Sequence, residues 1–312
     1  MTWCPIPADL VQVFLNKEVT PGTFLEAGAT RYYPLAFGHT LGHTPIQRPP
    51  HPGGRQAIHV DSNIFGAVNP STRLTVPLRY DDAELQLEAV LGGVSTAGAW
   101  AIGSSLSSWS VGFTDTLRYW KYAGGMVADC AIDASFGSPT VATISFMHLG
   151  RTDAAAGGFP SLSAAPTLRP YILEDCAILG DASTPVATAL QPQGFSLNIS
   201  NGLIQNRAPG SHYPNCIVPG AFTVTGSMRF EASAEFESVL RAACDAFTTY
   251  YVQCTWTTGA KLVKLLMPVR FILPEHSTPE GNAPLSNDVS FVAAADDFAL
   301  TTETLVATST AY

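Results

Sequence analysis

The sequence has few charged residues, and positive charge is the scarcer of the two signs. Only 13% of its 312 residues are Asp, Glu, Lys or Arg, and 16 Lys and Arg stand against 25 Asp and Glu. The net charge is −9, and the four lysines, Lys17, Lys121, Lys261 and Lys264, form no cluster. A protein that grips nucleic acid needs clustered cations that displace phosphate counterions. Tight DNA binding is therefore excluded as the main role.

Long apolar runs and paired cysteines are also missing. No stretch approaches the roughly 18 to 20 apolar residues that cross a bilayer. The opening residues MTWCPIP have neither the basic start nor the apolar core of a secretory signal. The six cysteines lie far apart, with no C-x-x-C pair. We therefore expect no membrane partner and reduced thiols in a cytoplasm.

Signatures of catalysis are absent as well. The sequence contains no H-E-x-x-H, no phosphate-binding P-loop and no dinucleotide-binding G-x-G-x-x-G after a strand. Four histidines, His39, His43, His51 and His59, lie close together, and histidine is the commonest metal ligand. Because their segment is rich in turn residues, no helix aligns them on one face. The sequence predicts no enzyme, no cofactor and no metal site, and it leaves the role of these histidines open.

What the sequence does contain is strand periodicity. Phe195, Leu197 and Ile199 alternate with polar residues, as in a strand with one buried face. The segment from Phe222 to Phe230 alternates in the same way. Further strands are predicted for Leu74–Tyr80, Ser110–Thr116, Met126–Ile132, Val141–Met147, Tyr171–Leu179, Tyr250–Thr258, Leu262–Leu273, Val289–Phe298 and Leu300–Ala307. The expected fold class is mainly β.

Two segments have helical spacing instead. Residues 81–91 place apolar residues on one helical face, and Gly92-Gly93 follows as a stop. Residues 233–247 do the same, with Ser233 as the N-cap. Each is one amphipathic helix, and we expect one face of each to be buried against a sheet.

The two helical segments and the strands before them match each other. Leu78-Arg79-Tyr80-Asp81 resembles Met228-Arg229-Phe230-Glu231 at a separation of 150 residues, and 86–91 resembles 235–240 at 149. This repeat predicts two modules from an internal duplication, residues 1–165 and 166–312. The boundary falls in the turn-rich stretch 154–166. A Pro/Gly-rich stretch, 34–57, cannot be a helix or a central strand, and we interpret it as a contact arm.

Several of these segments resemble the tail tube proteins of long, non-contractile (siphovirus-type) phage tails. The resemblance covers residues 170–312 well and residues 1–170 less evenly, and the stretches 34–57 and 92–108 depart from it. The segments that carry it are 16–23, 195–201, 220–230, the helix from Ser233, 264–273 and 289–307.

The resemblance implies a structural virion protein made of β-sandwich or barrel modules, each flanked by a helix. Such proteins form rings that stack into the tail tube, the channel for DNA ejection. A chain with two fused modules is expected to form trimers with pseudo-sixfold symmetry. Its partners would be further copies of itself and the tail tip initiator, terminator and tape measure proteins, with DNA passing only transiently. Its location would be the virion tail, after assembly in the host cytoplasm.

Acidic charge fits such a channel, because like charges keep DNA from adhering to the wall. Other interpretations remain open at this point. A capsid decoration protein or a minor tail protein would share the β fold and the lack of catalysis. A carbohydrate-binding or hydrolase sandwich would need an aromatic cleft with paired acids, and the sequence shows no such pairing.

Overall fold

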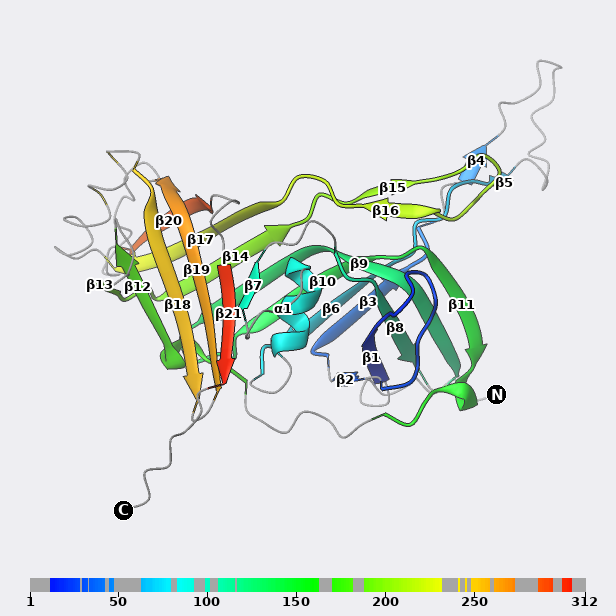
Figure 1. Cartoon of the computed structure of the whole chain (residues 1–312), viewed down its shortest axis with the longest axis horizontal. Coiled ribbons are helices and arrows are strands. Elements are labelled where there is room, and N and C mark those ends of the chain that lie inside the picture. The colour runs from blue at the N-terminus through cyan, green and yellow to red at the C-terminus, as the bar shows by residue number, and fades with distance from the viewer. Residues whose placement is uncertain are drawn as a thin grey trace, which may run out of the picture.

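The structure is a computed structural model of the 312-residue chain. It describes residues 12–28, 30–32, 34–42, 45–47, 63–79, 83–92, 99–101, 106–115, 117–162, 170–181, 188–231, 241, 245, 248–258, 261–272, 286–293 and 299–304. Strands dominate this part of the chain, which confirms the expected mainly β class (Figure 1). Most of the second predicted helix lies outside the described residues, although positions 241 and 245 are helical.

The strands fall into two sets along the chain. The first strand set comprises β1 (Gln12–Lys17), β2 (Thr30–Tyr32), β3 (Ala36–Thr40), β4 (Pro45–Gln47), β5 (Asn63–Phe65), β6 (Ser71–Pro77), β7 (Ala99–Ala101), β8 (Trp109–Thr114), β9 (Arg118–Ser135), β10 (Val141–Met147) and β11 (Gly150–Ala155). Helix α1 (Ala83–Leu91) lies between β6 and β7.

The second strand set comprises β12 (Cys176–Asp181), β13 (Thr188–Leu190), β14 (Gly194–Ser200), β15 (Ile204–Asn206), β16 (Cys216–Val218), β17 (Thr223–Glu231), β18 (Tyr250–Thr258), β19 (Lys261–Ile272), β20 (Ser286–Ala293) and β21 (Ala299–Thr304). Short 3₁₀ turns occur at Ala156–Gly158 and Leu173–Asp175. None of the helices described is long and apolar enough to cross a membrane.

The strand pairings of the first set recur in the second. β1–β2, β1–β8, β3–β6 and β4–β5 correspond to β12–β13, β12–β18, β14–β17 and β15–β16. The pairings β6–β10, β8–β9, β9–β10 and β9–β11 correspond to β17–β20, β18–β19, β19–β20 and β19–β21. All of these pairs are antiparallel, and they follow the same chain order in both sets once β7, which has no counterpart among the described strands, is set aside.

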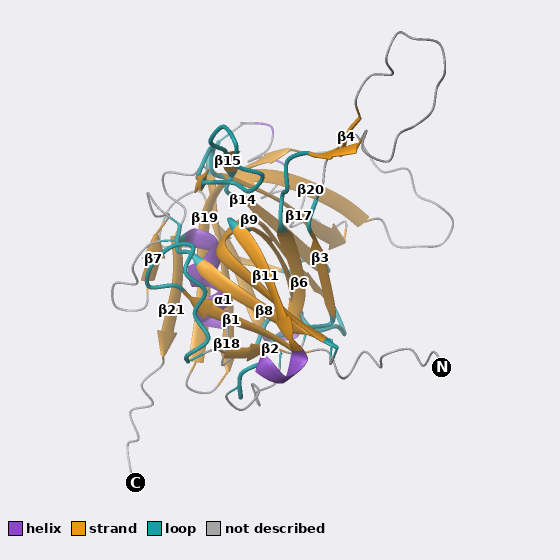
Figure 2. Cartoon of the chain, turned by 90° about the vertical axis from the view of Figure 1, so that its right-hand side faces the viewer, coloured by secondary structure: helices purple, strands orange, loops and turns teal. Residues whose placement is uncertain are grey.

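Strand β9 is the longest strand and joins two layers. Its first part lies between β8 and β11, and its second part lies between β10 and β14. Figure 2 shows β1, β8 and β11 as a layer beside β3 and β6. The sequence predicts only Met126–Ile132 as a strand here, whereas the strand extends from Arg118 to Ser135. Gly124 has a positive φ of 66° within the strand, a conformation that glycine adopts without strain.

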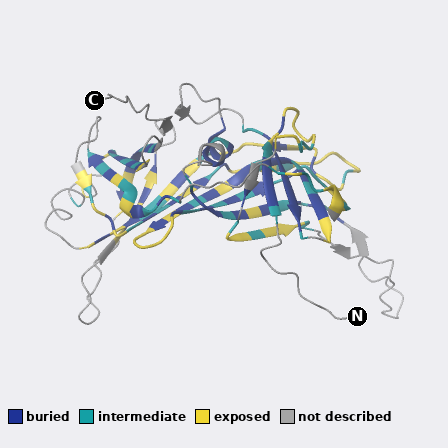
Figure 3. Cartoon of the chain, turned by 90° about the horizontal axis from the view of Figure 1, so that it is seen from below, coloured by how far each residue is buried: buried dark blue, intermediate teal, exposed yellow. Residues whose placement is uncertain are grey.

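One hydrophobic core runs through both strand sets. It includes Trp109 and Ile132 from the first set and Leu197 and Phe291 from the second. Buried and exposed residues alternate along the strands that flank it (Figure 3). Three large tryptophan side chains, Trp109, Trp120 and Trp256, are buried.

Two details of the sequence analysis need correction. The stretch 154–166 is not turn-rich throughout, because Ala154 and Ala155 close strand β11 against β9. Part of the stretch 34–57 is not an arm, because Ala36–Thr40 pairs with β6 as strand β3. Among the described strands β3 pairs with β6 alone, so the exclusion of a central strand stands.

Candidate assembly surfaces

The candidate metal ligands do not converge in the described residues. They contain no group of three or more His, Cys, Asp or Glu that could hold a metal ion. Of the four clustered histidines, His39 lies on β3, whereas His43, His51 and His59 lie outside the described residues. The Nδ1 atom of His39 is 2.9 Å from the Tyr122 hydroxyl, so this histidine belongs to an aromatic cluster.

The two strand sets are joined by two strand pairings of their own. Strand β14 of the second set pairs with the second part of β9, from Gly194 opposite Ser135 to Ser200 opposite Asp129. Strand β7 of the first set pairs with β21 of the second. The junction is therefore a continuous antiparallel sheet, built by β addition between the sets.

A third connection is made by the β15–β16 hairpin, whose connecting loop reaches the segment of the first set between β5 and β6. The Val68 amide donates to the His212 carbonyl at 2.9 Å. The Arg207 guanidinium donates to the Val68 carbonyl at 3.1 Å. The hairpin is thus hydrogen-bonded to the segment that precedes β6.

Helix α1 forms because its sequence is rich in helix-favouring residues and carries Leu87 and Leu91 one turn apart on one face. The helix closes at Gly92, which has a φ of 67° and whose amide donates to the Glu88 carbonyl at 3.1 Å. The predicted helix is confirmed over Ala83–Leu91, with its glycine stop, and residues 81 and 82 lie outside the described residues.

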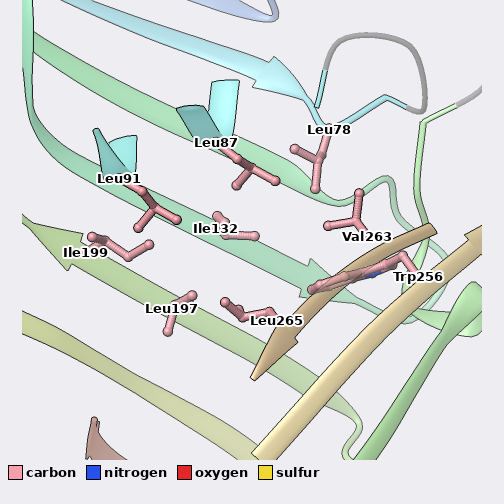
Figure 4. A pocket seen from close by; sticks show the side chains of 9 residues that line it. All are labelled: Leu78, Leu87, Leu91, Ile132, Leu197, Ile199, Trp256, Val263 and Leu265. Atoms are coloured by element: carbon pink, nitrogen blue, oxygen red, sulfur yellow. The ribbon is translucent and has the colours of Figure 1, made fainter. Parts of the chain in front are cut away.

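The apolar face of α1 covers the second strand set. Leu87 and Leu91 point toward β14 and β19 across a small apolar cavity of about 10 Å³ (Figure 4). The residues that line this cavity are Leu78, Leu87, Leu91, Ile132, Leu197, Ile199, Trp256, Val263 and Leu265. Complete burial of each leucine is worth roughly 1.5–3 kcal/mol, so this cover stabilises the junction strongly.

A polar contact fixes the end of the helix over the sheet. The buried Asn201 side chain, directly after β14, donates to the carbonyls of Val90 and Val127 at 2.9 Å each. One amide group therefore ties α1, β9 and β14 together. Loss of this side chain would leave two carbonyls without their donor.

The first strand set has an equivalent face. In the second set Trp256 of β18 lies opposite Val263 of β19, and in the first set Phe113 of β8 lies opposite Trp120 of β9. Phe37 of β3 stacks on Phe113 with ring centroids 4.6 Å apart, and Phe113 stacks on Trp120 at 4.9 Å. An aromatic stack thus occupies the place that the cavity-lining residues hold in the second set.

Two glycines hold the same place after β3 and β14 and so show how the residues of these two strands correspond. Gly42 follows β3 with a φ of 57°, and Gly202 follows β14 with a φ of 53°. At both positions a Cβ atom would come within 2.7 Å of a backbone carbonyl oxygen, that of Asn69 or Ala221. When the sequence is aligned on these two glycines, Leu35, Phe37 and His39 match Phe195, Leu197 and Ile199.

These matched residues differ in exposure. Leu35 is 64% exposed, whereas Phe195 is 2% exposed. Phe37 is half-buried and His39 is exposed, whereas Leu197 and Ile199 are buried. We call Leu35, Phe37 and His39 the β3 patch. Within the part of the chain that the structure describes, this patch has no cover comparable to α1.

The comparison with known proteins now assigns the family. A sequence model of the family described as phage tail tube protein matches residues 9–293. The chain belongs to the phage tail tube protein family. It is a structural protein of the virion, located in the tail, where such proteins assemble with their own kind and with other tail proteins. No curated protein matches the sequence.

In this tail tube protein the first strand set is held by a buried carboxylate. Glu18 accepts hydrogen bonds from the amides of Gly22 and Gly124 and from the hydroxyls of Ser108 and Ser110, at 2.6–2.9 Å. Four donors satisfy its two oxygens and connect the end of β1 to β8 and β9. The resemblance noted for 16–23 therefore falls on a structural anchor.

The β3 patch of the tail tube protein is close to neutral in charge. Although His39 is exposed at one side, the surrounding rings partly desolvate it and lower its pKa, and the nearby Arg151 cation lowers it further, so the neutral ring predominates at neutral pH. Arg151 is itself paired with Asp153 through two hydrogen bonds of 2.7 and 2.9 Å. An uncharged, aromatic surface of this kind favours protein contacts over binding of an ion.

Two strand edges of the tail tube protein carry no ladder partner among the described strands. Strand β3 is paired on the edge facing β6 only. Strand β19 pairs with β18 as far as Val269, and its Arg270–Ile272 segment is paired with β20 on the opposite edge alone. Open edges are templates for pairing with another chain.

Proposed function

We propose that this tail tube protein polymerises as rings of three chains, stacked into the tube of a siphovirus-type tail. Each chain would supply two tandem modules, residues 1–165 and 166–312, so that a ring has six similar units. The observation that carries this proposal is the recurrence of eight strand pairings in the two strand sets. A duplicated unit can occupy six equivalent places with only three chains.

The junction inside one chain supplies a template for the contact between chains. Strand β14 of the second set pairs with β9 of the first. By the same pattern, the open edge of β3 would pair with β19 of the next chain, beyond Val269. Such a head-to-tail contact joins different surfaces of the two partners, and it produces a ring when its rotation closes.

The hairpins would act as contact arms between chains. Within the chain, the β15–β16 hairpin grips residues around Val68, just before β6. Its counterpart is the β4–β5 hairpin, which lies in the stretch 34–57 and beyond. The arm would therefore grip the neighbour around Val218–Ala221, just before β17. Val218 is exposed, as a contact residue must be in the free chain.

The stacked rings would form the channel for DNA ejection. A net charge of −9 would repel passing DNA rather than hold it. The role is structural rather than catalytic, and the partners would be the tail tip initiator, the terminator and the tape measure protein. Assembly would take place in the host cytoplasm, where the unbridged Cys130, Cys176, Cys216 and Cys254 stay reduced.

Electron microscopy of the purified full chain over a concentration series tests this proposal. We expect hollow tubes or flat rings with apparent sixfold symmetry once the concentration is high enough for β3 of one chain to pair with β19 of the next. A chain that remains monomeric at every concentration would contradict self-assembly. So would a closed globular oligomer without a central channel.

A further inference from the structure

The β3 patch has a covered equivalent in the same molecule, and that equivalent indicates what binds it. We propose that Leu35, Phe37 and His39 form the docking surface for residues 235–240 of a second copy of the chain. This inference rests on the proposed ring and assigns a second element of its interface, in addition to the paired strand edges.

The first support is the arrangement at the junction inside the chain. There β14 is paired with β9 along its edge and covered by α1 on its face. Both covering elements, α1 and β9, belong to the first strand set. A neighbour that donates β19 to the edge of β3 would therefore bring the element after its β17 to the face of β3.

The second support is the sequence of that element. Residues 235–240, EFESVL, follow β17 as residues 86–91, QLEAVL, follow β6. Phe236 and Leu240 match Leu87 and Leu91, the two α1 side chains that cover the cavity. Apolar residues four apart lie on one helical face, so as a helix this segment would present the same pair of apolar side chains.

The third support is the chemistry of the patch. Leu35 lies two residues before Phe37, on the same side of the strand, and is 64% exposed. His39 lies 5.2 Å from the rings of both Phe113 and Trp120, and its Nδ1 is already bonded to Tyr122. Such a surface offers apolar contact area, which the side chains of Phe236 and Leu240 match.

The topology excludes the chain's own segment as the occupant. Strand β17 is separated from β3 by β14, β9, β10 and β6, which is five strand spacings or about 24 Å. The segment between Glu231 and Thr248 begins and ends in the second strand set. As a helix it would be only about 24 Å long, too short to reach the patch and return.

A pair of leucine variants tests the patch. Leu35→Asp changes an exposed side chain, so circular dichroism and thermal unfolding should match those of the parent chain. Sedimentation and electron microscopy should show loss of at least ten-fold in the assembled fraction. Leu117→Asp is the matched control, since Leu117 is 69% exposed in the turn between β8 and β9, and it should assemble as the parent does. Normal assembly of Leu35→Asp overturns the inference.

Crosslinking identifies the occupant. The photoreactive benzoylphenylalanine is placed at position 37, and chains labelled with heavy isotopes are mixed with unlabelled chains before assembly and irradiation. We expect crosslinked peptides that join a heavy and a light chain and contain residues 235–240. Rings whose position 37 crosslinks elsewhere, or only within one chain, overturn this inference and leave the ring intact. If the parent chain forms no rings at all, the proposed function fails and this inference fails with it.

Discussion

Strands β14 and β3 hold the same place in their strand sets, yet one is buried and the other is exposed. β14 lies beneath α1 and beside β9, and its Phe195, Leu197 and Ile199 side chains are buried. β3 has only β6 beside it among the described strands. The difference arises because elements of the first strand set, β9 and α1, cover the edge and the face of β14 in the second set. In the proposed ring, another chain would complete the first unit in the same way.

The two sets differ in their interiors as well. Of the nine buried polar or charged residues in the described part of the chain, all but Asn201 precede β12. The buried face of the second set is built almost entirely from apolar side chains. Polar networks cost more when disrupted, because each broken bond leaves a desolvated group. The two sets should therefore respond differently to substitution and to pH.

The largest expected effect comes from removing the cover of the second set. Leu91 is 1% exposed and faces the cavity, so Leu91→Asp places a charge against β14 and β9. We expect a loss of about 3–5 kcal/mol in the free energy of unfolding, or no soluble protein. Urea unfolding measures it. Glu88→Gln on the same helix is the control and should change stability by less than about 1 kcal/mol, because its Lys17 partner is solvent-accessible.

A smaller loss is expected when the anchor of the first set is removed. Glu18→Ala leaves four donors without an acceptor, two of them the amides of Gly22 and Gly124. We expect a loss of about 3 kcal/mol, and Glu18→Gln should lose less because one carbonyl oxygen remains. Hydrogen exchange should show the loss in β1, β8 and β9 before β18 and β19. A uniform loss of hydrogen-exchange protection over both strand sets would contradict the claim that Glu18 stabilises the first set alone.

The next effect is a pH dependence confined to the first set. His148 is fully buried, its Nε2 lies 2.8 Å from the Thr72 hydroxyl, and burial lowers its pKa from 6.5 to about 3. The unfolded chain binds a proton below pH 6.5 while the folded chain does not until near pH 3. Stability from the neutral ring is thus full above pH 6.5 and declines as the pH falls toward 3.

This decline amounts to about 2 kcal/mol near pH 5, from about 1.4 kcal/mol per pKa unit. Thermal unfolding of the parent and of His148→Gln, followed from neutral pH downward, measures the difference. The variant should lose less stability than the parent between neutral pH and pH 5. Parallel curves for the two proteins would show that His148 does not carry the effect.

The smallest expected effect is a gain at the cavity. Val263 lines the apolar cavity beneath α1, and Val263→Ile adds one methyl group to it. We expect the free energy of unfolding to rise by about 0.5–1 kcal/mol. Val269→Ile, at a buried site of the same strand that does not line the cavity, is the control and should gain nothing. Equal changes in both variants would mean that the cavity is not a packing defect.

The sequence predicted strands well wherever one face is buried. Phe195, Leu197 and Ile199 alternate with polar residues, and all three lie in strand β14, as expected. Strand β1 was missed because Val13, Phe14 and Leu15 are apolar in succession. Phe14 packs into a second aromatic cluster with Tyr119 and Phe24 while its neighbours face the main core. A strand buried on both faces shows no alternation.

The candidate surface could not be predicted, because its parts are distant in sequence. His39 meets Tyr122 across 83 residues, and no local pattern announces that contact. The helical match of 86–91 with 235–240 did indicate a repeat. What it could not indicate is that α1, besides packing on β9 of its own set, also faces strands of the second set. That arrangement arises from the β9–β14 pairing, which only the folded chain displays.

The number of chains in one ring tests the central claim most directly. Native mass spectrometry of rings isolated before stacking, together with their rotational symmetry in cryo-electron microscopy, measures it. We predict three chains of 33.0 kDa in a ring with six similar lobes and true threefold symmetry. A ring of six chains with sixfold symmetry would contradict the claim that the two strand sets of one chain occupy adjacent places.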